Sequence, residues 1–137
     1  GIEPFLITSA LLGVVAQRLV RRLCPACRES RGITEAAHNL LLELTGQAPP
    51  SDQRICEPKG CPACGQTGFQ GRFALQEILL PDGEFWAMMR RGLPEGRIRE
   101  EAIRRGMEPM AQDGCRKVLA GLTSLDEVLR VTRADGL

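Results

Sequence analysis

The chain has 137 residues, enough for one hydrophobic core and too few for two. Hydrophobic residues make up 43% and charged residues 26%, as in an ordinary globular protein. With 18 basic and 17 acidic residues the formal net charge is +1, so no global positive field attracts nucleic acid or an anionic membrane. Aromatic side chains, on which single-stranded nucleic acids stack, make up only 4%.

The longest apolar stretch, residues 5–16, is too short to span a membrane. It also lacks the basic start and the small-residue cleavage site of a secretory signal peptide. These absences favour a reducing cytoplasm, where paired Cys-x-x-Cys motifs bind metal more often than they form disulfides. The chain starts at Gly1 and an apolar helical pattern follows almost at once, as expected of a segment cut from a longer protein.

The N-terminal pattern predicts a helix over residues 6–23, ended by Pro25. Apolar side chains occupy one side of this helix, and another side is basic. The basic side consists of three arginines at helical spacing: Arg18, Arg21 and Arg22. We interpret them as a solvated face.

The rest of the chain predicts helices and one strand. Residues 33–46 form a helix with Thr34 as N-cap and Gly46 just past its end. After a loop rich in Pro and Gly, partial alternation predicts a strand over residues 71–80. Further helices are predicted over residues 82–92, 94–106, 108–121 and 123–133. In the last of these, Ser124 and Glu127 have the spacing of a capping box.

The sequence Cys-Pro-Ala-Cys occurs twice, and each copy forms a turn that points two sulfurs at one spot. Two such turns together offer the four thiolates that Zn²⁺ prefers in structural sites. The predicted ligands of one structural zinc ion are Cys24, Cys27, Cys61 and Cys64. The metal would hold both ends of residues 28–60, a segment with too little apolar content to hold itself in place. Zinc binding of about 10–16 kcal/mol easily tolerates this long spacer, because each doubling of loop length costs only about 0.6 kcal/mol.

Alternatives to this site are a redox dithiol and a pair of disulfides. Catalytic zinc is disfavoured, because four cysteines leave no open coordination position. Cys56 is interpreted as a free thiol in a loop, with a role as spare ligand as the alternative. Cys115 is interpreted as a small buried apolar residue within a helix.

The chain lacks the common catalytic and phosphate-binding motifs. It has no G-x-x-x-x-G-K-[ST], no G-x-G-x-x-G, no H-E-x-x-H and no G-x-S-x-G, and His38 is its single histidine. We therefore predict no catalytic and no nucleotide-binding residue in it. The predicted fold class is mainly α, with a small zinc-held insertion and a short β element.

Three segments carry a specific combination of motifs. They are AQRLVR with the first Cys-Pro-Ala-Cys, the second copy followed by G-x-x-G-R, and AQDGCRKVLAGLTSLDEVLRVTR. Together they resemble the C-terminal part of the type II secretion ATPase E family, which is closely related to the type IV pilus assembly ATPases. The match departs from the family at Ala26 and Ala63, which are often polar there, and at Cys115, where a bulky residue is usual.

The resemblance implies the tetracysteine-bearing, C-terminal part of a RecA-like motor. It divides the chain into a helix continuing from a missing nucleotide-binding domain (1–23), a tetracysteine zinc-binding element (24–64), and a strand with C-terminal helices (65–137). By position it assigns zinc to the same four cysteines. The motifs that bind ATP and Mg²⁺ would belong to the parent protein upstream of Gly1, so this chain alone is not expected to hydrolyse ATP.

The resemblance also implies partners and a location. The parent would be a cytoplasmic homo-hexamer, peripheral to the inner membrane, that docks on platform and membrane-anchoring proteins and drives assembly of a pilus-like fibre. It would have no membrane span of its own and no nucleic-acid partner. The alternative is a free-standing zinc-binding adaptor for protein or nucleic acid.

Overall fold

The computed structural model describes residues 4–92 and 94–132. These residues form two compact units, and the boundaries between the units fall after residues 16, 75 and 109. The ends of two segments predicted from the sequence, residues 1–3 and 133–137, lie outside the described residues.

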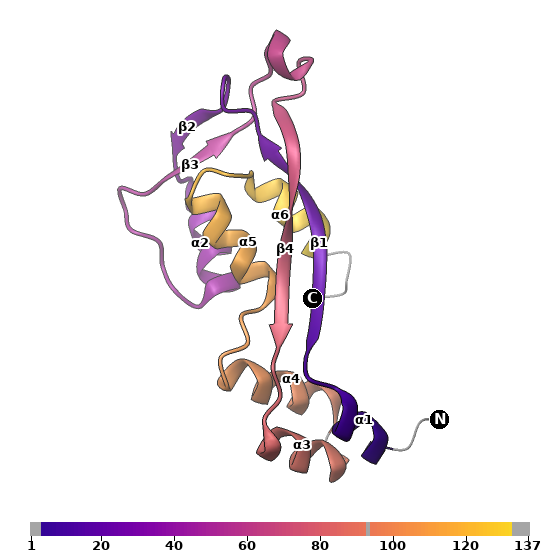
Figure 1. Cartoon of the computed structure of the whole chain (residues 1–137). Helices are drawn as coiled ribbons and strands as arrows, with labels where there is room; N and C mark the ends of the chain where they lie inside the picture. The colour runs from indigo at the N-terminus through magenta and orange to yellow at the C-terminus, as the bar shows by residue number, and fades with distance from the viewer. Residues whose placement is uncertain (1–3, 93, 133–137) are drawn as a thin grey trace. The chain divides into compact units, whose positions relative to one another are not determined.

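Helices and strands alternate irregularly along the chain (Figure 1). In chain order the elements are α1 (Pro4–Ala10), β1 (Val14–Leu23), β2 (Glu29–Gly32), α2 (Glu35–Thr45), β3 (Arg54–Glu57), the short 3₁₀ helix η1 (Pro62–Cys64), β4 (Phe69–Leu79), α3 (Gly83–Arg90), α4 (Glu95–Arg104), α5 (Met110–Leu119) and α6 (Leu125–Thr132). The longest described helix, α2, has 11 residues, and no described helix is both long and apolar enough to cross a membrane.

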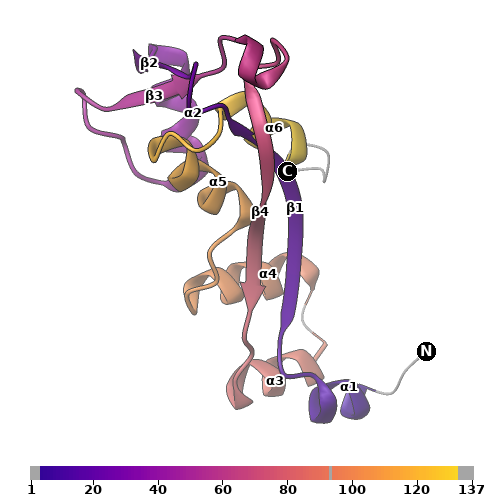
Figure 2. The same ribbon diagram turned by 45° about the horizontal axis from the view of Figure 1, so that its top comes forward.

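Strand β1 replaces most of the helix that the sequence predicts over residues 6–23, so that prediction holds only as far as Ala10 and is wrong after it. Apolar residues at three- and four-residue spacing fit a helix, but this segment is also rich in valine, whose branched side chain favours strands. It pairs with β4, and Figures 1 and 2 both show the two strands side by side. The β element is therefore larger than predicted, with strands of 10 and 11 residues.

The core of the second unit lies where α5 and α6 meet the two long strands. Val20 of β1, Leu75 of β4 and Val128 of α6 are completely buried there. Gly114 lets α5 approach α6 closely, because a Cβ atom at this position would lie 2.4 Å from Val128 Cγ1. The contact has no room for a larger side chain.

The segment between the two cysteine turns contributes to this core. Strands β2 and β3 pair antiparallel, with Ser30 opposite Cys56, and both α2 and β3 contact α5. Leu41 of α2 is 1% exposed and Ile55 of β3 is 7% exposed. These two side chains attach the middle of the segment to the core, which its composition did not predict. That the metal holds the two ends of the segment stays a prediction. The predicted helix is confirmed in α2, with Thr34 as its N-cap and a left-handed Gly46 at its end.

The first unit packs α3 and α4 around Phe85 and Ala102, each 2% exposed. Asp82 caps α3 as predicted, because its Oδ1 accepts a hydrogen bond of 2.7 Å from the Phe85 amide. Arg105, which follows α4, pairs with Asp82 at 2.6 Å and with Glu84 at 3.1 Å. The guanidinium thereby joins the N-terminal end of α3 to the C-terminal end of α4.

A buried carboxylate joins α6 to β1. Glu127 accepts hydrogen bonds from the Arg21 amide at 3.1 Å and from Arg21 Nη2 at 2.6 Å, and Arg130 donates two more. The predicted capping box is thus only half present: Ser124 Oγ accepts from the Glu127 amide at 3.4 Å, while the carboxylate turns to the strand. Burial acts to raise the pKa of Glu127, but hydrogen bonds from Arg21 and Arg130 outweigh it and lower this pKa to about 2.

This shift predicts an acid-sensitive contribution to stability. The pKa of Glu127 is about 2 in the folded state and about 4.3 in the unfolded chain. The carboxylate therefore contributes its full stabilisation above about pH 5 and loses it as the pH falls from about 4.3 toward about 2. We expect the difference in unfolding free energy between the wild type and Glu127→Gln to shrink by roughly 0.5–1 kcal/mol between pH 7 and pH 4.

Urea denaturation at the two pH values measures this difference. The cysteines are common to both proteins, so their own pH dependence cancels. Asp126→Asn, which removes an exposed carboxylate from the same helix, is the matched control. A difference that stays constant between pH 7 and pH 4 would contradict the role assigned to Glu127.

Candidate metal centre

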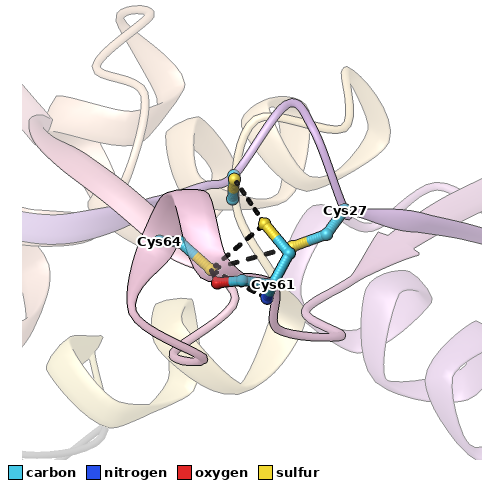
Figure 3. Close-up of side chains that lie close together, drawn as sticks. Cys27, Cys61 and Cys64 are labelled. Carbon is cyan, nitrogen blue, oxygen red and sulfur yellow. Dashed lines mark hydrogen bonds between the residues drawn. The ribbon is translucent and has the colours of Figure 1, made fainter.

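The structure brings the four predicted cysteines together from two turns that are distant in sequence. Their Sγ atoms all lie within 4.8 Å of one another. The Sγ–Sγ distance is 3.8 Å for Cys61 and Cys64, 3.9 Å for Cys27 and Cys64, and 4.0 Å for Cys24 and Cys61. Figure 3 shows the side chains of Cys27, Cys61 and Cys64 converging on this point. All six cysteines of the chain are free, so the cluster contains no disulfide.

The first cysteine turn (residues 24–27) follows directly on β1. Cys24 is completely buried, and its carbonyl accepts hydrogen bonds from the amides of Cys27 at 3.3 Å and Arg28 at 3.0 Å. The Cys24 amide in turn donates to the Gly68 carbonyl at 2.9 Å. A backbone hydrogen bond therefore joins the first turn to the segment that follows the second turn.

The second cysteine turn (residues 61–64) coincides with η1. Pro62 stands at its first position, where a fixed φ favours the turn and the missing amide costs nothing. Gly65 closes it in the left-handed conformation with φ 60°. Pro and Gly thus fix the two ends of the turn that carries Cys61 and Cys64.

Backbone amides point at the sulfur of Cys64. Those of Cys61 and Gly68 both donate to Cys64 Sγ at 3.2 Å. Burial acts to raise the pKa of Cys64, but these two donors outweigh it and lower the pKa to about 6. These donors thus favour the thiolate of Cys64, the form that binds metal.

Cys27 shows the opposite behaviour. Burial raises its pKa to about 11, helped by the neighbouring thiols and opposed by a hydrogen bond from the Gly60 amide. Four sulfurs this close cannot all ionise unless a cation compensates their charge. Metal binding would therefore displace protons from the cluster, so its affinity for metal would fall with decreasing pH.

The dimensions of the cluster fit a tetrahedral ion. Bonds of about 2.3 Å from zinc to sulfur give a tetrahedron with edges of about 3.8 Å, close to the three Sγ–Sγ distances of 3.8, 3.9 and 4.0 Å. The cluster contains no histidine or carboxylate ligand. Four sulfurs would fill the tetrahedral coordination sphere of a bound zinc ion and leave no position for a substrate.

The two remaining cysteines lie outside the cluster. Cys56 is partly buried on β3, a strand and not the loop that the sequence predicts. Cys115 is completely buried within α5, as predicted, and burial raises the pKa of its thiol to about 11. Neither belongs to the group of side chains that could hold an ion.

The sequence singles out Gly65 and Gly68 as flexible backbone that lets the second turn close, and the structure gives Gly68 a more specific role. Its amide donates to Cys64 and its carbonyl accepts from Cys24, so this one peptide contacts both turns. Its φ is +76°, and a Cβ atom here would lie 2.5 Å from Pro58 Cβ. The Gly-x-x-Gly pattern after Cys64 was the available signal, but by itself it indicates only backbone freedom.

Comparison with known proteins identifies the family. The family described as Type II/IV secretion system protein matches residues 1–130. The chain belongs to this family. The resemblance inferred from the three sequence segments is thereby confirmed.

Relatives of the family come from several bacteria. The chain is 44% identical over 135 residues to the type II secretion system protein E of Aeromonas hydrophila, a match that covers 98% of this chain and 26% of that protein. It is 42% identical over 134 residues to the type II secretion system protein HxcR of Pseudomonas aeruginosa, covering 97% and 24%. It is 41% identical over 133 residues to the type IV pilus assembly ATPase PilB of Thermus thermophilus, covering 96% and 15%. The chain thus spans about a quarter, or less, of the length of these relatives.

The contacts of Gly68 predict a specific effect of Gly68→Ala on metal affinity. The added methyl group would collide with Pro58 and shift the peptide that contacts both cysteine turns. We expect zinc affinity, measured by competition with a chelator, to fall about 10- to 100-fold, as for other losses around a metal site.

Gly71→Ala is the matched control. Gly71 has the same φ of +76°, but nothing lies within 4 Å of its Cβ position. It therefore carries the backbone strain without the collision, and we expect its zinc affinity to stay within about threefold of the wild type. Equal losses in the two variants would show that strain alone, and not the contact with Pro58, explains the effect.

A second prediction concerns how far the loss of a ligand spreads. Cys61→Ser removes one sulfur, so hydrogen exchange should become faster across residues 24–64. Helices α3 and α4 belong to the other unit and should keep their protection. Cys56→Ser, a thiol outside the cluster, should leave exchange in residues 24–64 unchanged. Faster exchange throughout α3 and α4 would show that the cluster does not act locally.

Proposed function

We propose that this chain is the C-terminal, zinc-binding part of a cytoplasmic ATPase that powers type II protein secretion. One combined observation supports this function: four sulfurs within 4.8 Å of one another in a chain that matches the secretion family over residues 1–130. Neither the sulfur cluster nor the family match is sufficient by itself. Cysteine clusters occur in many protein classes, and the family match alone names no ligand.

In this proposal the zinc ion is structural, with Cys24, Cys27, Cys61 and Cys64 as its ligands. The ion would fix the two cysteine turns against each other, and with them both ends of the segment made of β2, α2 and β3. The backbone amides that donate to Cys64 would stabilise the bound thiolate.

The ATPase activity would belong to the parent protein. The chain spans 26% of the Aeromonas relative, and none of the phosphate-binding motifs searched for occurs in its 137 residues. We propose that the remainder of the longer protein binds ATP and Mg²⁺, and that the parent is a homo-hexamer at the cytoplasmic side of the inner membrane. Its partners would be the platform and membrane-anchoring proteins of the secretion machine.

Exposed apolar side chains of the first unit support contact with further protein. Leu12 is 91% exposed, Leu80 is 76% exposed and Val15 is 59% exposed. Large exposed apolar side chains mark a protein-contact surface where they adjoin one another. In the proposed motor, other parts of the parent protein or neighbouring subunits would cover them.

Two measurements test the proposal. Elemental analysis of the purified, metal-replete chain should find one zinc per molecule in the wild type and in Cys56→Ser, and much less in Cys61→Ser. The reading frame upstream of Gly1 should encode a phosphate-binding G-x-x-x-x-G-K-[ST] motif. Absence of zinc with titratable free thiols would refute the metal site, whereas a promoter and start codon at Gly1 would favour the free-standing adaptor.

A further inference from the structure

The turn between α5 and α6, residues 120–124, is hydrogen-bonded to backbone groups at the end of β1. The Leu23 amide donates to the Leu122 carbonyl at 2.9 Å. The Thr123 hydroxyl donates to the Arg21 carbonyl at 2.8 Å. Both contacts come from residues before the first cysteine, on a strand that is already paired with β4. They therefore persist whether or not a metal is bound.

A further contact with residues 120–124 comes from the residue just after the first cysteine turn. Arg28 directly follows Cys27, and its Nη1 donates to the Gly121 carbonyl at 2.6 Å. This carbonyl lies just beyond the C-terminal end of α5, where a positive charge is favourable. Arg28 lies between the first cysteine turn and β2, and its amide donates to the Cys24 carbonyl at 3.0 Å, which ties it to that turn.

The turn has little freedom around Gly121. Its φ is +68°, and a Cβ atom here would lie 3.0 Å from Cys56 Sγ and 3.4 Å from Arg28 Nη1. Cys56 of β3 and Arg28 thus both pack against Gly121. Release of Arg28 would remove one of these two restraints without opening the hydrophobic core.

We propose that Arg28 is a positioning residue that couples metal occupancy of the tetracysteine cluster to the turn before α6. With the metal bound, the first cysteine turn is fixed and Arg28 holds the Gly121 carbonyl. Without the metal, residues 24–28 loosen and this contact is lost, while the contacts of Leu23 and Thr123 remain. The effect at the turn is a faster local opening and not unfolding. This inference rests on the metal site proposed above.

Hydrogen exchange of the chain, with zinc bound and after removal of zinc by EDTA, tests the coupling. Chelation should accelerate exchange at residues 24–28 and, about three- to tenfold, at residues 120–124. Arg28→Ala with zinc bound should show the same acceleration at 120–124 while still binding one zinc. Chelation of Arg28→Ala should then accelerate exchange at residues 120–124 only a little further. Arg28→Lys keeps the charge but not the geometry of the guanidinium, so with zinc bound its exchange rate at 120–124 should lie between those of the wild type and Arg28→Ala.

Arg31→Ala is the control for loss of an arginine near the cluster. Its guanidinium pairs with Glu29 at 3.3 Å and with Glu57 at 3.1 Å, two residues of the paired strands β2 and β3. It should respond to chelation as the wild type does. Unchanged exchange at 120–124 on chelation, or an equal response in Arg28→Ala and wild type, overturns the coupling and leaves the zinc site intact. Absence of bound zinc in the wild type overturns both.

Discussion

The convergence of four sulfurs on one point is the constraint on which the second unit depends. It is prepared by the backbone: the Gly68 peptide contacts Cys64 through its amide and Cys24 through its carbonyl. These bonds join the two turns before any ion is considered. A site prepared in this way would bind metal with less loss of conformational freedom than one assembled from mobile loops.

The segment between the cysteine turns is held from two directions. The turns fix its ends, and Leu41 and Ile55 fix its middle against α5 and the core. Burial of two such side chains stabilises the segment by a few kcal/mol at most, on the order of 1.5–3 kcal/mol each. In the proposed site the metal would hold the ends of the segment, and the apolar contacts hold its middle.

Local sequence signals predicted some features correctly and failed where distant contacts decide. The paired Cys-Pro-Ala-Cys turns predicted the cluster, because geometry and chemistry are encoded within four residues. Thr34 and Gly46 predicted both ends of α2 for the same reason. The helix predicted over residues 6–23 failed because pairing of β1 with β4 joins residues far apart in the chain. The position of Glu127 indicated a local cap, but its carboxylate binds a strand more than a hundred residues earlier.

The six thiols differ in how accessible they are to a reagent. Four would be shielded by a bound cation, and Cys115 is sealed inside α5 with a pKa of about 11. Cys56 alone is neither within the cluster nor fully buried, and its sulfur faces Gly121. An alkylating reagent would therefore label the metal-loaded chain at a single position. A fluorophore attached there would sit beside the turn that leads into α6.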